Sequence, residues 1–213
     1  IEPSGTYAIG ADAYRQRLLY EDGLDISIPQ YLAFGEKALE ETRAQFIATA
    51  KKIDAKASPL AVYLSIAKVH PAPGDLVATA QRDLNRLRAF LIAKRIVTLP
   101  AGMSVKVIET PQFERDTTTA AEDSAGPFET VALQTYYYVT PVDPSWSHQQ
   151  TEDYLAQFNN FEFPIISAHE VYPGHATNFA IDRTLNLSLT RQLSQSSEFA
   201  EGWAHYSEQL MWD

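Results

Sequence analysis

The strongest constraint on the fold is the pair Pro173-Gly174, which lies between two histidines six positions apart, His169 and His175. An α-helix turns about 100° per residue, so six residues turn roughly 240°. In a continuous helix the two imidazoles would point to different sides. Proline removes a backbone donor and clashes with the preceding turn, while glycine allows backbone angles that other residues resist. We expect the helix to break here and to bring His175 back toward His169.

Two glutamates complete a set of residues that is typical of zinc hydrolases. Glu170 directly follows His169, and Glu201 starts a later Glu-Gly-Trp-Ala segment. Catalytic zinc sites use three protein ligands, often His and Glu, and keep one position open for water. A further carboxylate beside such a site can act as general base toward that water. The familiar helical peptidase motif has its histidines four residues apart, so this interpretation depends on the helix break.

These two motifs resemble a family of large bacterial proteins with a domain of unknown function, marked by His-Glu-x-x-Pro-Gly-His and a downstream Glu-Gly-Trp-Ala. That family is similar to the zincin metallopeptidases whose third metal ligand is Glu. The resemblance implies that His169, His175 and Glu201 bind Zn²⁺ and that Glu170 is the catalytic base. Many members have a second His where this chain has Ala176.

Several residues near the third ligand have competing interpretations. Glu198 lies three residues before Glu201 on a neighbouring helix position, so either could be the ligand. We favour Glu201 because it starts the second motif, whereas Glu198 suits a helix start. Gly202 is expected to let backbones approach closely near the metal. Glu208 is either a solvated helix residue or a hydrogen-bond partner of a ligand.

An oxyanion formed during hydrolysis also needs a hydrogen-bond donor. Zincins often use a Tyr or His after the third ligand, so the resemblance makes His205 and Tyr206 candidate catalytic residues. His205 stands where many members have a small apolar residue, and its alternative role is a structural hydrogen bond. His70, beside two prolines, is interpreted as a turn residue rather than a metal ligand.

The sequence therefore predicts a zinc-dependent peptidase that acts on a peptide or a small peptide-like substrate. One alternative is a catalytically inactive metal- or peptide-binding domain. Another is a structural helical domain in which His169 and His175 satisfy buried polar groups.

Apolar periodicity predicts a mainly helical chain with a small β-sheet, an α+β fold, and the resemblance implies a zincin-like helical domain. Helix starts are expected at Ser27, Ser58, Asp75 and at Ser147 or Thr151. Short strands are expected at residues 97–99, 105–109 and 128–139, and residues 112–126 are predicted to be a loop. The tyrosine-rich segment 128–139 is interpreted as a half-buried strand. The zincin resemblance implies, as an alternative, that part of it holds an extended peptide at a sheet edge.

Length and charge limit the remaining possibilities. The 213 residues are predicted to be one domain or a fragment of a larger, largely helical protein, with a helical part (1–95), a β part (96–140) and metal-motif helices (141–213). A net charge of −10 disfavours nucleic acid as a partner. No apolar run reaches membrane-spanning length. The chain has no Cys, which fits either an exported or a cytoplasmic protein. The resemblance favours an exported, periplasmic location over the cytoplasm. The sequence does not indicate the oligomeric state.

Overall fold

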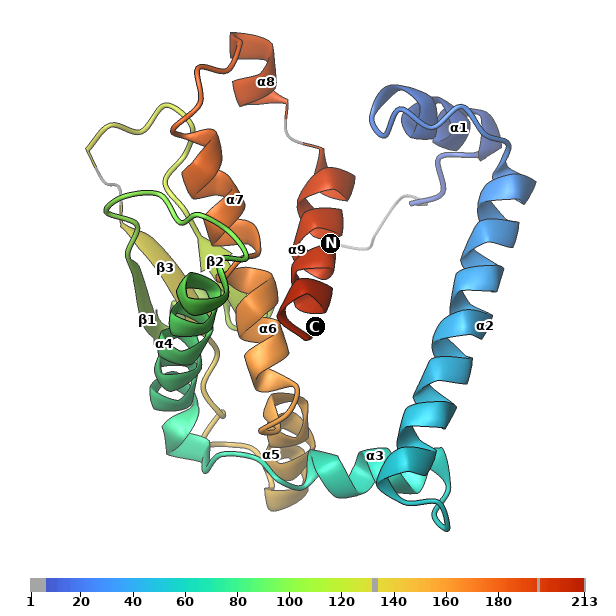
Figure 1. The fold of residues 1–213 in the computed structure, drawn as a ribbon, viewed down its shortest axis with the longest axis vertical. Helices are drawn as coiled ribbons and strands as arrows, with labels where there is room; N and C mark the ends of the chain where they lie inside the picture. The colour runs from blue at the N-terminus through green and yellow to red at the C-terminus, as the bar shows by residue number, and fades with distance from the viewer. Residues whose placement is uncertain (1–6, 132–133, 195, 213) are drawn as a thin grey trace. The chain divides into compact units, whose positions relative to one another are not determined.

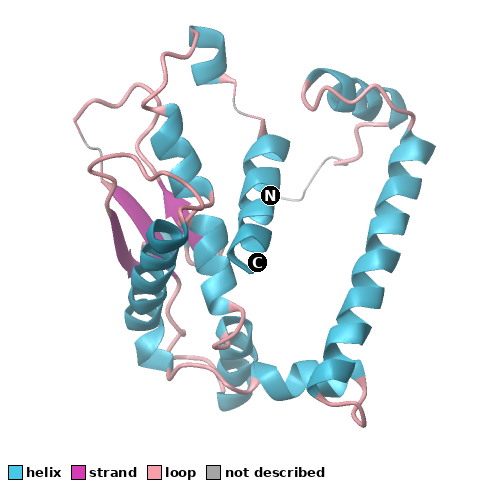
Figure 2. Cartoon of the chain, viewed as in Figure 1, coloured by secondary structure: helices cyan, strands magenta, loops and turns pink. Residues whose placement is uncertain are grey.

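The computed structural model describes residues 7–131, 134–194 and 196–212. It confirms the predicted α+β class, with most elements helical and one small sheet (Figure 1, Figure 2). The chain forms two compact units, residues 1–63 and 64–213, and the boundary lies within the third helix. Unit 1 contains α1 (Ala11–Tyr20), α2 (Ile28–Ile53) and the start of α3 (Pro59–Ala67). Unit 2 contains α4 (Leu76–Lys94), β1 (Val105–Glu109), β2 (Ala120–Asp123), β3 (Thr135–Val139), α5 (His148–Leu155), α6 (Phe163–Glu170), α7 (His175–Asp182), α8 (Leu189–Leu193), α9 (Ser197–Trp212) and 3₁₀ turns at Pro73–Asp75, Gln112–Glu114 and Ala156–Phe158.

Capping side chains fix where several helices begin. At the start of α2, Ser27 accepts a hydrogen bond from the Gln30 N–H, and the Gln30 side chain accepts one from the Ser27 N–H. This reciprocal pair satisfies two of the backbone donors that a helix start leaves free. Ser58 caps α3 through the Ala61 N–H, and Ser147 is the cap of α5. Asp75 occupies the predicted cap position of α4 but makes no capping hydrogen bond with its side chain.

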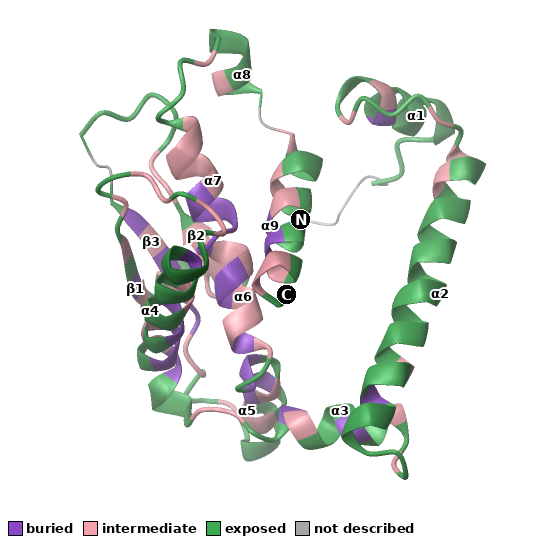
Figure 3. Ribbon diagram, in the orientation of Figure 1, coloured by how far each residue is buried: buried purple, intermediate pink, exposed green. Residues whose placement is uncertain are grey.

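The core of unit 2 forms around α4, whose apolar side packs against β1, β3 and α6 (Figure 3). Leu76, Ala80, Leu84 and Leu91, spaced four or seven residues apart, are each at most 2% exposed and form a buried stripe along α4. Burying one such leucine stabilises a fold by about 1.5–3 kcal/mol. The same core includes residues from the sheet, from α5 and from the two sides of the helix break: Val107, Tyr137, Val139, Tyr154, Leu155, Phe158, Phe163, Val171, Tyr172 and Ala176.

The sheet has the strand order β1-β3-β2, with β3 in the centre. β1 pairs with β3 in parallel and β2 pairs with β3 antiparallel. Alternate residues of β3 are buried, as expected for a strand that covers a core with one face. Tyr137, on the buried face, lies within hydrogen-bond distance of Ser167 on α6, with 3.3 Å between the two hydroxyl oxygens.

The predicted strand at residues 97–99 is wrong, because α4 ends in a tight turn just before it. Arg95 adopts a left-handed conformation (φ 56°), and the Ile96 N–H bonds to the Leu91 carbonyl. This arrangement closes the helix end and sends the chain into an irregular segment. Leu99 still packs on the core, which explains its apolar character without a strand.

The strand predicted at residues 105–109 is confirmed as β1, whereas the predictions for residues 128–139 and 112–126 need correction. Only Thr135–Val139 of the predicted strand 128–139 pairs in the sheet; Phe128 and Val131 are exposed, and residues 132–133 lie outside the described part of the chain. Because β3 is the central strand, it cannot be the peptide-binding edge. The predicted loop 112–126 instead contains β2, an edge strand that contacts α6 and α7. Its sequence, Ala-Ala-Glu-Asp, has low β-propensity, so its pairing with β3 determines its conformation.

Among the described helices, none combines the length and apolar character needed to cross a membrane.

Candidate metal centre

The predicted helix break lies between α6, which ends at Glu170, and α7, which begins at His175. The backbone of the break is held by local hydrogen bonds. The Val171 carbonyl accepts both the N–H and the hydroxyl of Thr177, and the Gly174 N–H bonds to the Ala168 carbonyl. Thr177 is fully buried, so these polar groups have partners inside the protein, as buried backbone requires.

Gly174 is required by a close approach between the two helices. A Cβ atom at this position would lie 1.6 Å from the carbonyl oxygen of His169 and 2.6 Å from that of Ala168. Both neighbours are backbone atoms of α6, which cannot move aside as a flexible side chain could. The absence of a side chain at residue 174 therefore lets the start of α7 lie directly against the end of α6.

The break brings the two histidine rings together, as the sequence predicts. The ring centroids of His169 and His175 are 4.8 Å apart and the rings are nearly perpendicular. His175 is buried, and burial lowers the pKa of its imidazole. The Nδ1 atom of His175 is buried and has no hydrogen-bond partner among the described residues, so its polar interactions are made through Nε2.

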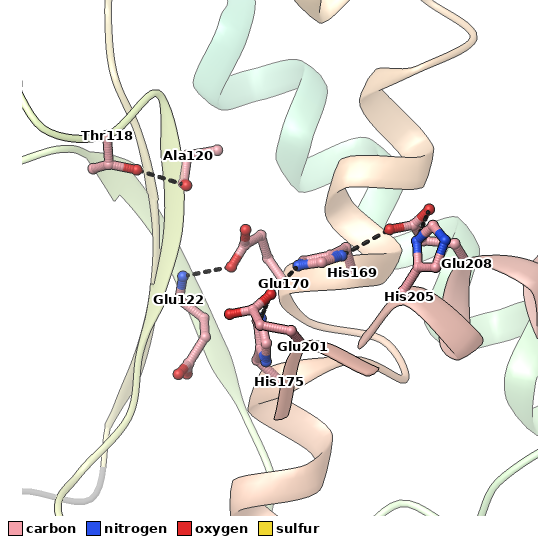
Figure 4. Close-up of polar contacts among 9 residues, drawn as sticks. All are labelled: Thr118, Ala120, Glu122, His169, Glu170, His175, Glu201, His205 and Glu208. Carbon is pink, nitrogen blue, oxygen red and sulfur yellow. Dashed lines mark hydrogen bonds and ion pairs between the residues drawn. The ribbon is translucent and has the colours of Figure 1, made fainter. Parts of the chain in front are cut away.

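Helix α9 places Glu201, the predicted third ligand, opposite these rings. It packs against both α6 and α7, and the Trp203 indole N–H donates to the Pro173 carbonyl at 2.9 Å. Glu201, two residues earlier, lies with Oε2 3.4 Å from His169 Nε2 and 3.6 Å from His175 Nε2 (Figure 4). The second motif thus docks on the first through its Trp and its Glu.

The donor atoms of this set fit a single divalent cation. One atom from each of His169, His175 and Glu201 lies within 4.8 Å of the others. Ligands at 2.0–2.1 Å from a tetrahedral zinc ion are separated by roughly 3.3–3.4 Å, close to the two observed histidine–glutamate distances. Two His and one Glu form a ligand set that catalytic zinc sites use. Residues and spacing are therefore compatible with zinc.

A second carboxylate orients the first histidine. Glu208 Oε1 lies 2.7 Å from His169 Nδ1, and Glu208 Oε2 lies 3.3 Å from His205 Nδ1. The bond to Glu208 raises the pKa of His169 despite partial burial. Burial opposes ionisation of Glu208, but the hydrogen bonds from His169 and His205 outweigh it and lower the pKa of that carboxyl. Glu208 is thus a hydrogen-bond partner of His169 rather than a solvated residue, and metal-binding histidines commonly have such a carboxylate on their other nitrogen.

Glu170 lies on the opposite side of His169 from Glu208, next to the edge strand (Figure 4). Its Oε2 accepts the backbone N–H of Glu122 on β2 at 3.0 Å. Burial raises the pKa of Glu170 to about 7, against the opposing effects of His169 and of the Glu122 hydrogen bond. The sequence alone could not reveal the contact with β2, since the residues of β2 resemble a loop.

The cavity at this centre, about 230 Å³, contains the predicted base and two of the predicted ligands. Neither His205 nor Tyr206 lines it. The side chain of His205 is 83% exposed and contacts Glu208, and the ring of Tyr206 contacts Trp203. The cavity is lined by Ala121, Glu122, Glu170, His175, Phe179, Ser196, Ser197, Ala200 and Glu201.

Three further predicted residues take positions outside the ligand set. Glu198 bonds to the Ser196 hydroxyl at the start of α9, which supports its role at a helix start. A Cβ atom on Gly202 would meet no described atom within 4 Å, so the expected close backbone approach at this residue is wrong. His70 lies in a turn, where its Nε2 is 3.4 Å from Glu152.

A bacterial family profile matches residues 2–213 of the chain, which is nearly its whole length. The chain belongs to the family described as "Bacterial protein of unknown function (DUF885)". No curated protein matches this DUF885 chain.

Two solved structures resemble the DUF885 chain. A putative lipoprotein of unknown function from Shewanella oneidensis has a TM-score of 0.81 and 26% sequence identity, and the match covers 99% of this chain. A putative lipoprotein from Colwellia psychrerythraea has a TM-score of 0.73 and 18% identity over 95% of this chain, a similarity of fold alone. The chain spans 39% of the first protein's length and 34% of the second's.

Proposed function

We propose that this DUF885 chain contains the metal centre of a zinc-dependent peptidase. The observation that carries the proposal is that the helix break and α9 gather three donor atoms within 4.8 Å of one another, with Glu170 in the same cavity. Glu201 approaches both histidines from another helix, the arrangement that a shared cation requires.

Each residue has a distinct role in the proposed reaction. A zinc ion held by His169, His175 and Glu201 supplies Lewis-acid activation of water and of a scissile carbonyl. Glu170 accepts the proton of the attacking water and delivers it to the leaving nitrogen. The Glu122 N–H fixes the Glu170 carboxylate beside the cavity, and Glu208 orients His169. His205 then supports Glu208 from the outer side of the helix.

The edge strand β2 offers a way to hold a peptide next to this centre. An extended peptide can add to a sheet edge through main-chain hydrogen bonds, and the resemblance to zincins implies this mode of binding. β2 pairs with β3 on one side only, and its Ala121 and Glu122 line the cavity. For this reason we propose that the substrate has a peptide or peptide-like backbone.

We also propose an exported location. The two similar structures are of putative lipoproteins, a description that fits proteins processed outside the cytoplasm. The activity is expected of the larger protein, since the chain spans less than half of the length of either relative.

The test compares metal content and peptide hydrolysis in matched variants of the purified protein. Glu170→Gln keeps the size of the side chain and removes the base, so we expect hydrolysis to fall by about 100-fold or more with unchanged zinc content. Glu198→Gln, an exposed glutamate on α9 outside the cavity, is the control and should retain activity. His169→Ala should lose the metal.

Two outcomes would contradict the proposal in different ways. Zinc in the wild type without hydrolysis of any peptide would indicate an inactive metal-binding domain. No bound metal in the wild type and no effect of His169→Ala would leave a structural role for both histidines.

A further inference from the structure

A second cavity adjoins the metal centre and shares two of its wall residues, Glu122 and Phe179. It has a volume of about 220 Å³ and lies between β2, the loop after β2, α7 and α8. We call it the side cavity. The two cavities meet at Glu122 on β2 and Phe179 on α7. Its lining includes four ionisable groups, those of Glu122, Asp182, Arg183 and Arg191.

The Arg183 guanidinium holds one wall of the side cavity. Its Nη1 donates to the carbonyls of Ala125 and Gly126 at 3.0 and 2.8 Å, and its Nη2 donates to the carbonyl of Glu129 at 2.7 Å. These bonds tie the loop after β2 to the end of α7. Arg183 thus has a structural task, and among the described residues it forms no ion pair with an acidic group of the cavity.

Asp182, the other acidic residue of the side cavity, has an arginine near it. Burial raises the pKa of Asp182, and the nearby charge of Arg191 opposes this shift. Both residues line the side cavity near α8. Of the two described acidic residues that line this cavity, Glu122 is therefore the one whose charged neighbours have the same sign as its own.

Glu122 lies at the junction of the two cavities, and its carboxylate has no cationic partner among the described residues. Its carboxylate accepts one hydrogen bond, from the Ser124 hydroxyl at 2.5 Å. Burial raises its pKa to about 7, and the charged neighbours that act on it, Glu170 and Asp123, are both carboxylates. Figure 4 shows its carboxylate directed away from that of Glu170. A buried carboxylate is costly unless it is paired with a cation or hydrogen-bond donors, and a ligand with N–H donors and positive charge would supply both.

We propose that the Glu122 carboxylate binds an ammonium group of the substrate in the side cavity, next to the metal centre. This inference rests on the proposed peptidase function and names its substrate class: peptides with a cationic group close to the scissile bond. A peptide offers this chemistry from two sources, its free α-amino group or a lysine side chain.

The experiment measures the ratio of kcat/KM for peptides that differ only in the ammonium group. The first pair has the same lysine-free sequence with a free or an acetylated N-terminus. Further acetylated peptides carry one lysine at successive positions, each compared with the matching acetyl-lysine. The zinc-loaded wild type, Glu122→Gln and Asp123→Asn are compared. Asp123 is the matched control because it is the next carboxylate on β2 but bonds to Tyr138 and does not line either cavity.

We expect the wild type to favour the ammonium-bearing member of one pair. Glu122→Gln should lower that ratio by about tenfold to hundredfold, the range for a hydrogen bond to a charged group, and Asp123→Asn should change it by less than about twofold. Preference for the free N-terminus identifies the α-amino group, and preference for one lysine position identifies the side chain.

An unchanged ratio in Glu122→Gln would overturn the inference while the proposed function stands. Absence of hydrolysis in the wild type would overturn the proposed function instead. In that case binding of the same peptides is measured by calorimetry. Tighter binding of the ammonium-bearing peptide that is lost in Glu122→Gln supports the inference. Equal binding of both peptides of every pair, or no binding, refutes it.

Discussion

Replacement of Gly174 by alanine tests whether the helix break is built on a close backbone approach. The added Cβ would overlap the His169 carbonyl oxygen at 1.6 Å, and the Ala168 carbonyl lies at 2.6 Å. Relief requires α7 to move away from α6 by more than 1 Å, which disturbs the buried core at Val171 and Ala176. Overpacking of this kind costs about 1–3 kcal/mol, and we expect the upper end because both clashing groups are backbone. The same displacement would move His175 out of reach of a shared cation.

The assay is denaturant unfolding of Gly174→Ala beside a matched control, Gly202→Ala. A Cβ on Gly202, in α9, meets no described atom within 4 Å, so alanine there should stabilise the helix by about 0.5–1 kcal/mol. The two substitutions add the same methyl group and should therefore have opposite signs. Zinc affinity, measured by competition with a chromogenic chelator, should fall in Gly174→Ala alone. A Gly174→Ala protein with wild-type stability and zinc affinity would refute the close approach.

Two further substitutions test how α9 completes the centre. Glu208→Gln should weaken zinc binding by about 10- to 100-fold, the usual effect of losing a carboxylate partner of a ligating histidine. His205→Ala should weaken zinc binding less, because His205 contacts Glu208 and not His169. Equal losses in the same competition assay would contradict this order. Trp203→Phe removes the indole hydrogen bond to the Pro173 carbonyl and should lower the free energy of unfolding by about 1 kcal/mol, whereas an unchanged unfolding midpoint would show that this bond does not secure α9.

The sequence was most informative where one local rule determines the structure. Pro173 and Gly174 predicted the break between α6 and α7, and Ser27 caps α2 at the predicted helix start. The stripe along α4 likewise needs only helical periodicity. In each case every residue that carries the signal lies within about two helical turns of the next one.

Predictions failed where a distant partner determines the conformation. The residues of β2 favour a loop, and only β3, more than ten residues later, makes them a strand. The tyrosine-rich segment favours a longer strand than the sheet can pair, because Arg183 at the end of α7 holds residues before β3 as a loop. The role of Glu122 was missed for the same reason, since its approach to Glu170 spans 48 residues of sequence.

The two motifs form one cooperative unit rather than two independent sites. The turn between α6 and α7 presents the Pro173 carbonyl to Trp203 and both imidazoles to Glu201, while Glu208 holds His169 from the other side. Three residues within about two turns of α9 therefore contact the break or the histidines beside it. Because a cation would bind this docked arrangement and not the separated helices, a bound zinc ion would stabilise the contact of α9 with the break. Metal removal should accordingly loosen α9 first, while the α4 core, which shares none of these contacts, keeps its packing.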